Sequence, residues 1–301
     1  PPLVTDTLLT ALYAFAQEHP EVFRADRSLR KRALGDLTDR LPALTERAEH
    51  AHETRRATVL IDALIAAGAL GEESGIYPVN RAWRLMADLS PLTRLTSIIA
   101  AVACEEGQSR VVLTRAIETV LEALPPDRAM SALSIERLIV VLAANHSAET
   151  ARRAREQMTL LGLLVPTSDD YLIPAPLPRS HEHTKPLVIQ PNFDVTMPEE
   201  FSFSDGLLVA RVARLTRHDR YPHFELTKER LAAALRDGEE LEPIVERLRE
   251  LTNGALPQNV VVTMRSWTRE YESIRLYKGD GLQVEEARRF LGLPDVSGIN
   301  E

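Results

Sequence analysis

Three apolar stripes, separated by Gly238 and by Pro257, constrain the fold of this chain more than any other feature of the sequence. Thr227 can cap a helix that begins at Lys228, because its hydroxyl can accept a hydrogen bond from an early backbone N–H. Gly238 supplies the left-handed residue that ends this helix, and Pro257 suits the start of a later one. The spacing of three to four residues predicts three consecutive amphipathic helices. Their stripes are Leu231 and Leu235; Leu241, Ile244, Val245, Leu248 and Leu251; and Val260, Val261, Met264 and Trp267.

Apolar and polar residues alternate on both sides of these helices and predict strands. The first strand is expected at Leu187–Gln190, where it begins a paired-strand pattern, and an exit strand at Ser273–Tyr277. A further helical run is expected from Ser204 to about Asp219. We therefore expect a small α+β domain over residues 187–280, followed by a C-terminal extension at 281–301.

In this order, the pieces resemble the N-terminal conserved domain of the XPB-type DNA helicases, which bacteria also carry in helicase-associated proteins. The resemblance covers about a third of the chain. It rests on the motifs Leu226-Thr227-x-x-x-Leu231, Gly238 before the next helix, and Pro257-x-x-Val260 ahead of a helix with Trp267 and Tyr271.

The resemblance implies a domain that binds a protein partner. In the repair and transcription factor TFIIH, the XPB domain packs against a similarly folded clutch domain of a subunit that bears winged helices. The implied partner is a helicase or another repair or transcription protein, and the same surface could pair two copies of this chain. The implied contact residues are Leu187, Val188, Ile189 and Val195.

The chain departs from the helicases in lacking their motor motifs. It contains no Gly-x-x-x-x-Gly-Lys-[Ser/Thr] loop for phosphates and no Asp-Glu-x-His motif. A Gly-x-Ser-x-Gly elbow is also absent. We therefore expect no enzymatic activity, no catalytic residues and no cofactor.

A weak internal repeat organises the chain before residue 187. A helix expected at Thr54–Ala67 is followed by Gly68-Ala-Leu70, a polar turn and a short strand at Ile76–Val79. About 94 residues later, a helix at Ala148–Leu161 is followed by Gly162-Leu-Leu164, a polar turn and a strand at Tyr171–Ile173.

This order is typical of the last helix and wing of a winged-helix domain. We expect two tandem winged-helix-like units at residues 1–90 and 91–178, joined to the last domain by a linker at 179–186, which ends a stretch from Pro174 to Pro186 that contains four prolines. The predicted fold class is therefore mainly α, with an α+β C-terminal domain.

A winged helix binds either DNA or protein, and arginines on its last helix are the candidates for phosphate contacts. The alternative is that these arginines form ion pairs one helical turn away, with Glu149 and Glu156. Both turns of the expected wings are acidic, at Glu72-Glu73 and Asp169-Asp170, which disfavours DNA. The candidate DNA-binding residues are Arg152, Arg153 and Arg155 in the second unit and Arg55 and Arg56 in the first.

Composition disfavours several other functions. The formal net charge of −8 weighs against broad attachment to nucleic acid. The single cysteine, Cys104, and the absence of a long apolar run or a signal peptide fit a cytoplasmic protein without membrane contact. The pairs His50/His52 and His181/His183 lack the further ligands that a zinc site needs, so no metal is expected. Trp83 and Trp267 are expected to be core residues.

The function that the sequence favours is a non-enzymatic, helicase-associated adaptor in DNA repair or transcription. Two alternatives remain open at this stage. One is a winged-helix DNA-binding transcription regulator, and the other is a fragment of an XPB-like DNA helicase whose ATPase motor lies outside this chain.

Overall fold

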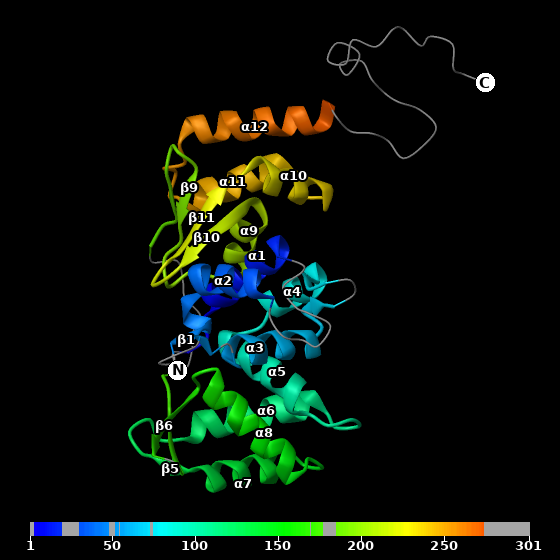
Figure 1. The fold of residues 1–301 in the computed structure, drawn as a ribbon, viewed down its shortest axis with the longest axis vertical. Coiled ribbons are helices and arrows are strands. Elements are labelled where there is room, and N and C mark those ends of the chain that lie inside the picture. Colours follow the sequence, from blue (N-terminus) through cyan, green and yellow to red (C-terminus); the bar gives the residue numbers. More distant parts are fainter. Residues whose placement is uncertain are drawn as a thin grey trace, which may run out of the picture.

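The computed structural model describes residues 3–19, 30–47, 52–53, 55–72, 75–168, 170–176 and 185–273. Over these ranges the protein is mainly helical and carries small antiparallel sheets, as the sequence predicts. The elements form three groups that follow one another along the longest axis of the molecule (Figure 1). We refer to residues 3–87 as the first group, 91–176 as the second and 185–273 as the third.

The first group lies in the middle of the molecule (Figure 1). Two short hairpins, β1–β2 and β3–β4, accompany its helices. Its elements are α1 (Asp6–Glu18), α2 (Lys31–Arg40), the 3-10 turn η1 (Pro42–Leu44), β1 (Glu46–Arg47), β2 (His52–Glu53), α3 (Arg55–Ala66), β3 (Leu70–Gly71), β4 (Tyr77–Pro78) and α4 (Asn80–Ala87).

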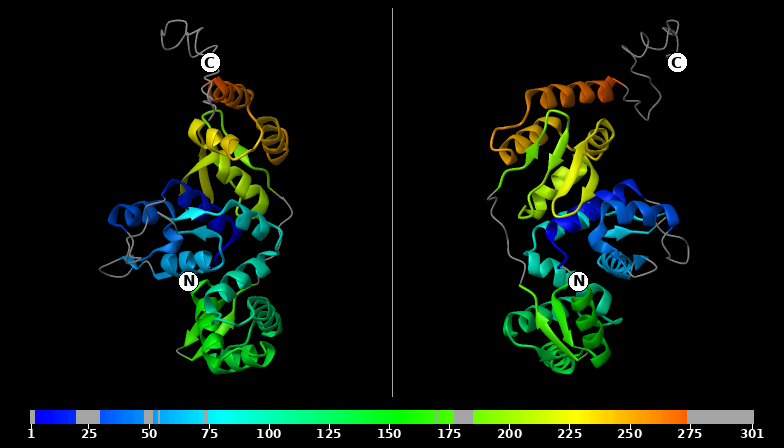
Figure 2. Two further views of the ribbon diagram at one scale, coloured as in Figure 1. Left: turned by 90° about the vertical axis from the view of Figure 1, so that its right-hand side faces the viewer. Right: turned by 60° about the vertical axis from the view of Figure 1, so that its left-hand side comes forward.

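The second group forms one end of the molecule (Figures 1 and 2). Within the described residues it has a three-stranded antiparallel sheet in the order β5-β7-β6. Its elements are α5 (Pro91–Ala103), α6 (Arg110–Ala123), β5 (Met130–Ser131), α7 (Ala132–Leu142), α8 (Ala148–Leu160), β6 (Leu164–Ser168) and β7 (Tyr171–Pro174).

The third group forms the opposite end and has an antiparallel sheet in the order β10-β11-β9-β8. The three helices α10, α11 and α12 follow the sheet in sequence. The elements are β8 (Val188–Ile189), β9 (Asp194–Thr196), α9 (Phe203–Val212), β10 (Ala213–His218), β11 (Pro222–Leu226), α10 (Lys228–Arg236), α11 (Leu241–Leu251) and α12 (Gln258–Ser273).

The three helices predicted after residue 224 are confirmed. The Thr227 hydroxyl accepts a hydrogen bond from the Arg230 N–H at 3.3 Å, and Gly238 has a φ of 91°. The residues of the three stripes are buried except for Leu235, Leu241 and Trp267, which are partly buried against the same core.

The helical run expected from Ser204 to about Asp219 is wrong in its second half. Ala213–His218 is strand β10, which pairs with β11 from Ala213↔Leu226 to His218↔Pro222. Ala213 and Leu215 turn inward and Arg214 outward, so the segment has a strand alternation that we overlooked beside the helical spacing of α9. Of the exit strand expected at Ser273–Tyr277, Ser273 is the last residue of α12 and the rest lies outside the described residues.

The internal repeat has a matching backbone at its two helix ends. Gly68 and Gly162 both have positive φ, of 73° and 81°. The next residue, Ala69 or Leu163, donates its N–H to the carbonyl five residues earlier, at 2.8 Å in both cases. Its own carbonyl then accepts from a residue after the hairpin, Val79 or Ala175, at 2.9 Å. The repeat seen in the sequence therefore reflects one helix ending and one hairpin closure used twice.

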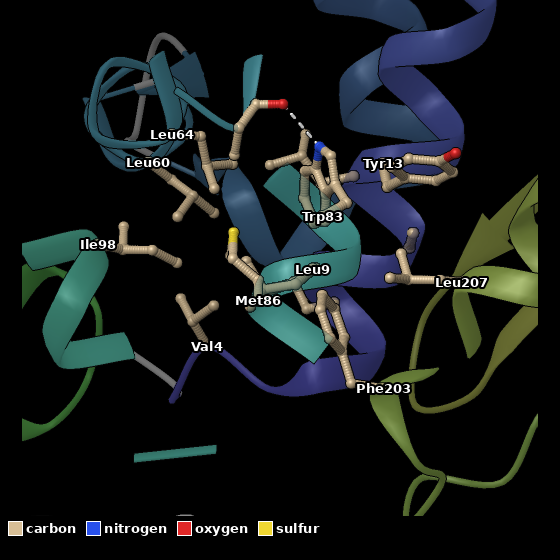
Figure 3. Close-up of a cluster of buried hydrophobic side chains, with 14 of the residues drawn as sticks. Val4, Leu9, Tyr13, Leu60, Leu64, Trp83, Met86, Ile98, Phe203 and Leu207 are labelled. Carbon is tan, nitrogen blue, oxygen red and sulfur yellow. Dashed lines mark hydrogen bonds between the residues drawn. The ribbon is translucent and has the colours of Figure 1, made fainter. Parts of the chain in front are cut away.

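One core joins the first group to its neighbours (Figure 3). Trp83 is buried, as the sequence predicts, and its indole N–H donates to the Ala69 carbonyl at 2.7 Å. Its ring makes an edge contact with Tyr13, at 5.1 Å between centroids, and lies 6.0 Å from Phe203 of the third group. Helix α1 is buried from Thr7 to Ala16 and packs against both α9 and β10.

Candidate interaction surfaces

Strand β8 is an edge of the third group's sheet among the described residues. It pairs with β9 through Val188↔Thr196 and Ile189↔Val195. Three of the four predicted contact residues, Leu187, Ile189 and Val195, point into the core, and only Val188 exposes its side chain, at 49%. The Leu187 N–H is already bonded to the Leu251 carbonyl at 2.8 Å. We call the outward side of this strand, with the Val188 side chain, the β8 edge.

The opposite edge of the same sheet is covered by the first group. Helices α1 and α2 both contact β10. The Arg40 guanidinium donates to the Leu215 carbonyl at 3.2 Å and forms an ion pair with Glu18 at 2.6 Å. The β8 edge is therefore the candidate for pairing with a partner strand.

The arginines predicted to bind DNA in the second group all lie on α8, and each is paired with a carboxylate. Arg152 bonds Glu149 at 2.7 Å and Glu156 at 2.5 Å. Arg153 shares Glu149 at 2.9 Å, and Arg155 is partly buried against Glu136 of α7 at 3.0 Å. Helix α8 carries three arginines and two glutamates, and Glu136 of α7 supplies the third carboxylate. The pairing with Glu149 and Glu156 that the sequence left open is the arrangement in this structure.

The bonds from Arg152 and Arg153 also change the acidity of their partner. They lower the pKa of Glu149 to about 2, while Glu149 and Glu156 together raise the pKa of Arg152. Glu149 therefore stays charged at every physiological pH. A phosphate that approached Arg152 would have to displace this carboxylate.

The two predicted arginines of the first group lie at the start of α3 and differ in environment. Arg55 is exposed. Arg56 is 1% exposed, and its guanidinium donates to the Ala43 carbonyl at 2.8 Å. In this conformation the Arg56 side chain holds α3 against η1 and does not reach the surface.

The hairpin β6–β7 is apolar where a DNA-gripping wing would be basic. Val165 and Tyr171 are exposed, and β6 and β7 contain no lysine or arginine. Asp170 is exposed in the turn, while Asp169 lies outside the described residues, as does Glu73 in the first hairpin. This surface offers no side-chain cation to a phosphate backbone.

A cavity of about 210 Å³ lies between α1, α4 and α9. The Tyr13 hydroxyl, on its lining, donates to Asn80 at 2.8 Å and accepts from Gln17 at 2.9 Å. Burial raises the pKa of Tyr13 to about 12, although Arg211 and Arg230 nearby oppose this rise. Arg211 and Arg84 both bond Glu239. These ion pairs link the first group, through Arg84, to the third group, through Arg211 and Glu239. The cavity is therefore part of the packing contact between the two groups.

Exposed apolar side chains on the second group were missed by the sequence analysis. Eight of the twelve large exposed apolar residues described in the chain belong to this group. A usable signal was the composition of α7, which is more apolar than one buried stripe requires. The eight are Val111, Val112, Leu133, Leu138, Val141, Leu142, Val165 and Tyr171.

No protein-family model matches this chain, and no curated protein matches it either. Of the histidines considered as metal ligands, His50, His181 and His183 lie outside the described residues. None of the described helices combines the length and the apolar character that crossing a bilayer requires.

Proposed function

We propose that this chain is a non-catalytic adaptor of DNA metabolism that docks a helicase, or a domain like its own third group, through the β8 edge. The observation that carries the proposal is the asymmetry of the sheet. One edge is covered by α1 and α2, and the other presents Val188 to solvent. An exposed edge strand favours pairing with a strand of another protein.

The second group supports the winged-helix part of the proposal through its connectivity. Helix α6, strand β5, helices α7 and α8, and the hairpin β6–β7 follow in this order, with β7 between β5 and β6 in the sheet. This is the order of a winged helix, in which α8 is the helix that a DNA reader would place in the major groove. The paired arginines of α8 and the apolar hairpin favour a protein-docking variant.

The test is affinity capture of the full chain from its native extract, with and without nuclease, followed by mass spectrometry. We expect a helicase to be captured in both conditions, and Val188→Asp to abolish its capture. Leu85→Asp is the matched control, because Leu85 is similarly exposed and lies on α4 in the first group. Equal capture by wild type and Val188→Asp would remove the β8 edge from the proposal, and ATP hydrolysis by the purified chain would contradict a non-catalytic role.

The second candidate is a winged-helix transcription regulator, which the exposure of Arg152 and Arg153 on α8 favours. It predicts duplex DNA binding that weakens steeply with salt and is lost in the double variant Arg152→Glu, Arg153→Glu. Fluorescence anisotropy with labelled duplex at several salt concentrations measures this. Binding that is absent in the wild type, or unchanged in the double variant, would reject this candidate.

A further inference from the structure

The segment that follows α7 and the segment that precedes α6 lie side by side in the second group. The His146 ring nitrogen Nε2, just after α7, lies 3.2 Å from the carbonyl oxygen of Ser109, just before α6. Helices α6 and α7 also pack against each other. Figure 1 shows α7 at the end of the molecule farthest from α12, with no other group covering it.

Apolar side chains are exposed on the helix turns that adjoin these two segments. Val141 is 77% exposed and Val111 is 64% exposed, the two highest values among the large apolar residues that the structure describes. Leu138 and Leu142 are also exposed, and with Val141 they have the spacing of a helix-packing stripe. We call these four residues, Val111, Leu138, Val141 and Leu142, the α6–α7 ridge.

The core of the second group does not need the ridge. Helix α7 buries Ile135 and Ile139, and α6 buries Leu113, Ile117 and Val120. Apolar side chains that stay exposed beside such a buried stripe, Val141 above all, are unfavourable in water unless another surface covers them.

The cations beside the ridge indicate the charge of what covers it. Arg115 lies one turn after Val111 on α6, and Arg137 lies one turn before Val141 on α7. Both are exposed, and neither has a carboxylate within ion-pair distance in the part of the chain that the structure describes. By contrast, the arginines of α8 are all paired. The ridge therefore combines apolar anchors with two available positive charges.

We propose that the α6–α7 ridge docks an amphipathic helix of a partner protein whose apolar stripe is flanked by acidic residues. Such a helix would pack its leucine-type side chains between Leu138, Val141 and Val111, as the side chains of packed helices interdigitate. Its carboxylates would bond Arg115 and Arg137 at the rim, which fixes its direction more than its affinity. A second copy of this chain suits the ridge less well, because two-fold pairing would bring Arg115 and Arg137 against their own copies.

This proposal concerns a surface at the other end of the molecule from the β8 edge, and the two can fail separately. The probe is a labelled 20-residue helical peptide with a leucine stripe and flanking glutamates, titrated against the full chain by fluorescence anisotropy. A lysine-for-glutamate version of the same peptide is the charge control. Val188→Asp should leave peptide binding unchanged, whereas it should abolish helicase capture.

We expect the acidic peptide to bind and the basic one to bind at least about tenfold more weakly, because like charges meet at the rim. Val141→Asp should weaken binding of the acidic peptide by about tenfold or more, as loss of a central anchor does. Val262→Asp is the matched control and should bind as wild type. The double variant Arg115→Glu, Arg137→Glu should reverse the preference between the peptides. Circular dichroism melts of every variant verify that the fold is retained.

Three results would overturn the proposal. The first is equal affinity of wild type for both peptides, and the second is unchanged affinity of Val141→Asp. The third is a different occupant: a dimer in sedimentation velocity that Val141→Asp dissociates identifies a second copy, and duplex DNA binding lost in the double variant identifies nucleic acid.

Discussion

Gly206 is a position of close approach between the first and third groups. A Cβ placed there would lie 2.8 Å from the Thr10 hydroxyl oxygen, closer than real side chains come. Helix α9 can lie against α1 only because this position has no side chain. The contact is invisible in the sequence, where Gly206 reads as an unfavourable residue inside a helix.

This close approach predicts a sign change in a double-mutant cycle. Gly206→Ala should lower the free energy of unfolding by roughly 1–3 kcal/mol, because overpacking outweighs the gain in helix propensity. In the Thr10→Ala background the hydroxyl and methyl that clash are gone, so the same change should be neutral or stabilising by about 0.5–1 kcal/mol. Urea denaturation of the four proteins measures the cycle. Equal effects in both backgrounds would contradict the contact.

Tyr13 makes the stability of the contact between the first and third groups depend on pH in the alkaline range. Its folded-state pKa, about 12, lies above the ordinary value of 10.0. The buried neutral hydroxyl therefore contributes stability that is fully present below pH 10 and is lost as pH rises toward 12. Over this window, the free energy of unfolding of the wild type should fall by up to about 1.4 kcal/mol per pH unit more than that of Tyr13→Phe, which has no group to ionise at this position. Tyr77→Phe is the control, because Tyr77 is exposed. The measurement is the free energy of unfolding of each protein between pH 9 and 12. If it depends on pH in the same way in wild type and in Tyr13→Phe, Tyr13 does not contribute this pH-dependent stability.

At the scale of single elements, the helix starts are strongly encoded. Side-chain hydroxyls cap seven helices, each accepting from the backbone N–H three residues on. Local chemistry of this kind needs no tertiary contact, and this explains why the helix starts at Ala148 and Lys228 could be predicted. The seven capping residues are Thr5, Ser90, Ser109, Ser131, Ser147, Ser202 and Thr227.

Ser147 tests the value of one such cap. Its hydroxyl accepts from the Thr150 N–H at 3.0 Å and also contacts Glu105 at 3.1 Å, which joins α8 to the α5–α6 loop. Ser147→Ala should cost about 1 kcal/mol of unfolding free energy, the usual value for a lost cap. Ser204→Ala is the control, because Ser204 is exposed and makes no hydrogen bond within the described part of the chain. A change below 0.3 kcal/mol in a thermal or urea melt, roughly the error of such measurements, would show that the cap is dispensable.

Strands were harder to predict than helices. Strand β10 follows α9 without a break, and its alternation extends over only a few residues. What makes it a strand is pairing with β11 and coverage by α1 and α2, contacts between residues far apart in the chain. The short strands β4 and β8 lie within the strands expected at Ile76–Val79 and Leu187–Gln190, where a turn signal adjoins a short apolar run.

At the scale of the whole molecule, α1 belongs to the cores of two groups. Arg94 of α5 is buried and adds to this connection. It pairs with Asp6 of α1 and donates to the Met86 and Leu89 carbonyls. Its guanidinium also lies 4.0 Å from the ring centroid of Phe203 in the third group. The first and third groups should therefore open together. Within the second group, α6, α7 and α8 pack chiefly against one another and against α5.

Native-state hydrogen exchange measures this division. Leu12→Ala in buried α1 should lower the opening free energy of α1, α9 and β10 by a common amount, roughly 2–5 kcal/mol, and leave α7 unchanged. Ile139→Ala, an equally buried residue of α7, is the matched variant and should affect α7 and α8 alone. A uniform loss of protection in either variant would mean that the chain opens as a single unit.

The sequence alone determined the helices, their caps, the repeated glycine ending at Gly68 and Gly162, and the burial of Trp83, because each depends on residues close together or on a local periodicity. It also offered the candidate residues for DNA and partner contacts. Only the tertiary structure decided that Arg56 is buried, that the arginines of α8 are paired, that one sheet edge is covered and that α7 leaves apolar side chains exposed beside its buried ones. These properties depend on what packs against each side chain, and that is fixed by contacts across long stretches of chain, which spacing does not reveal.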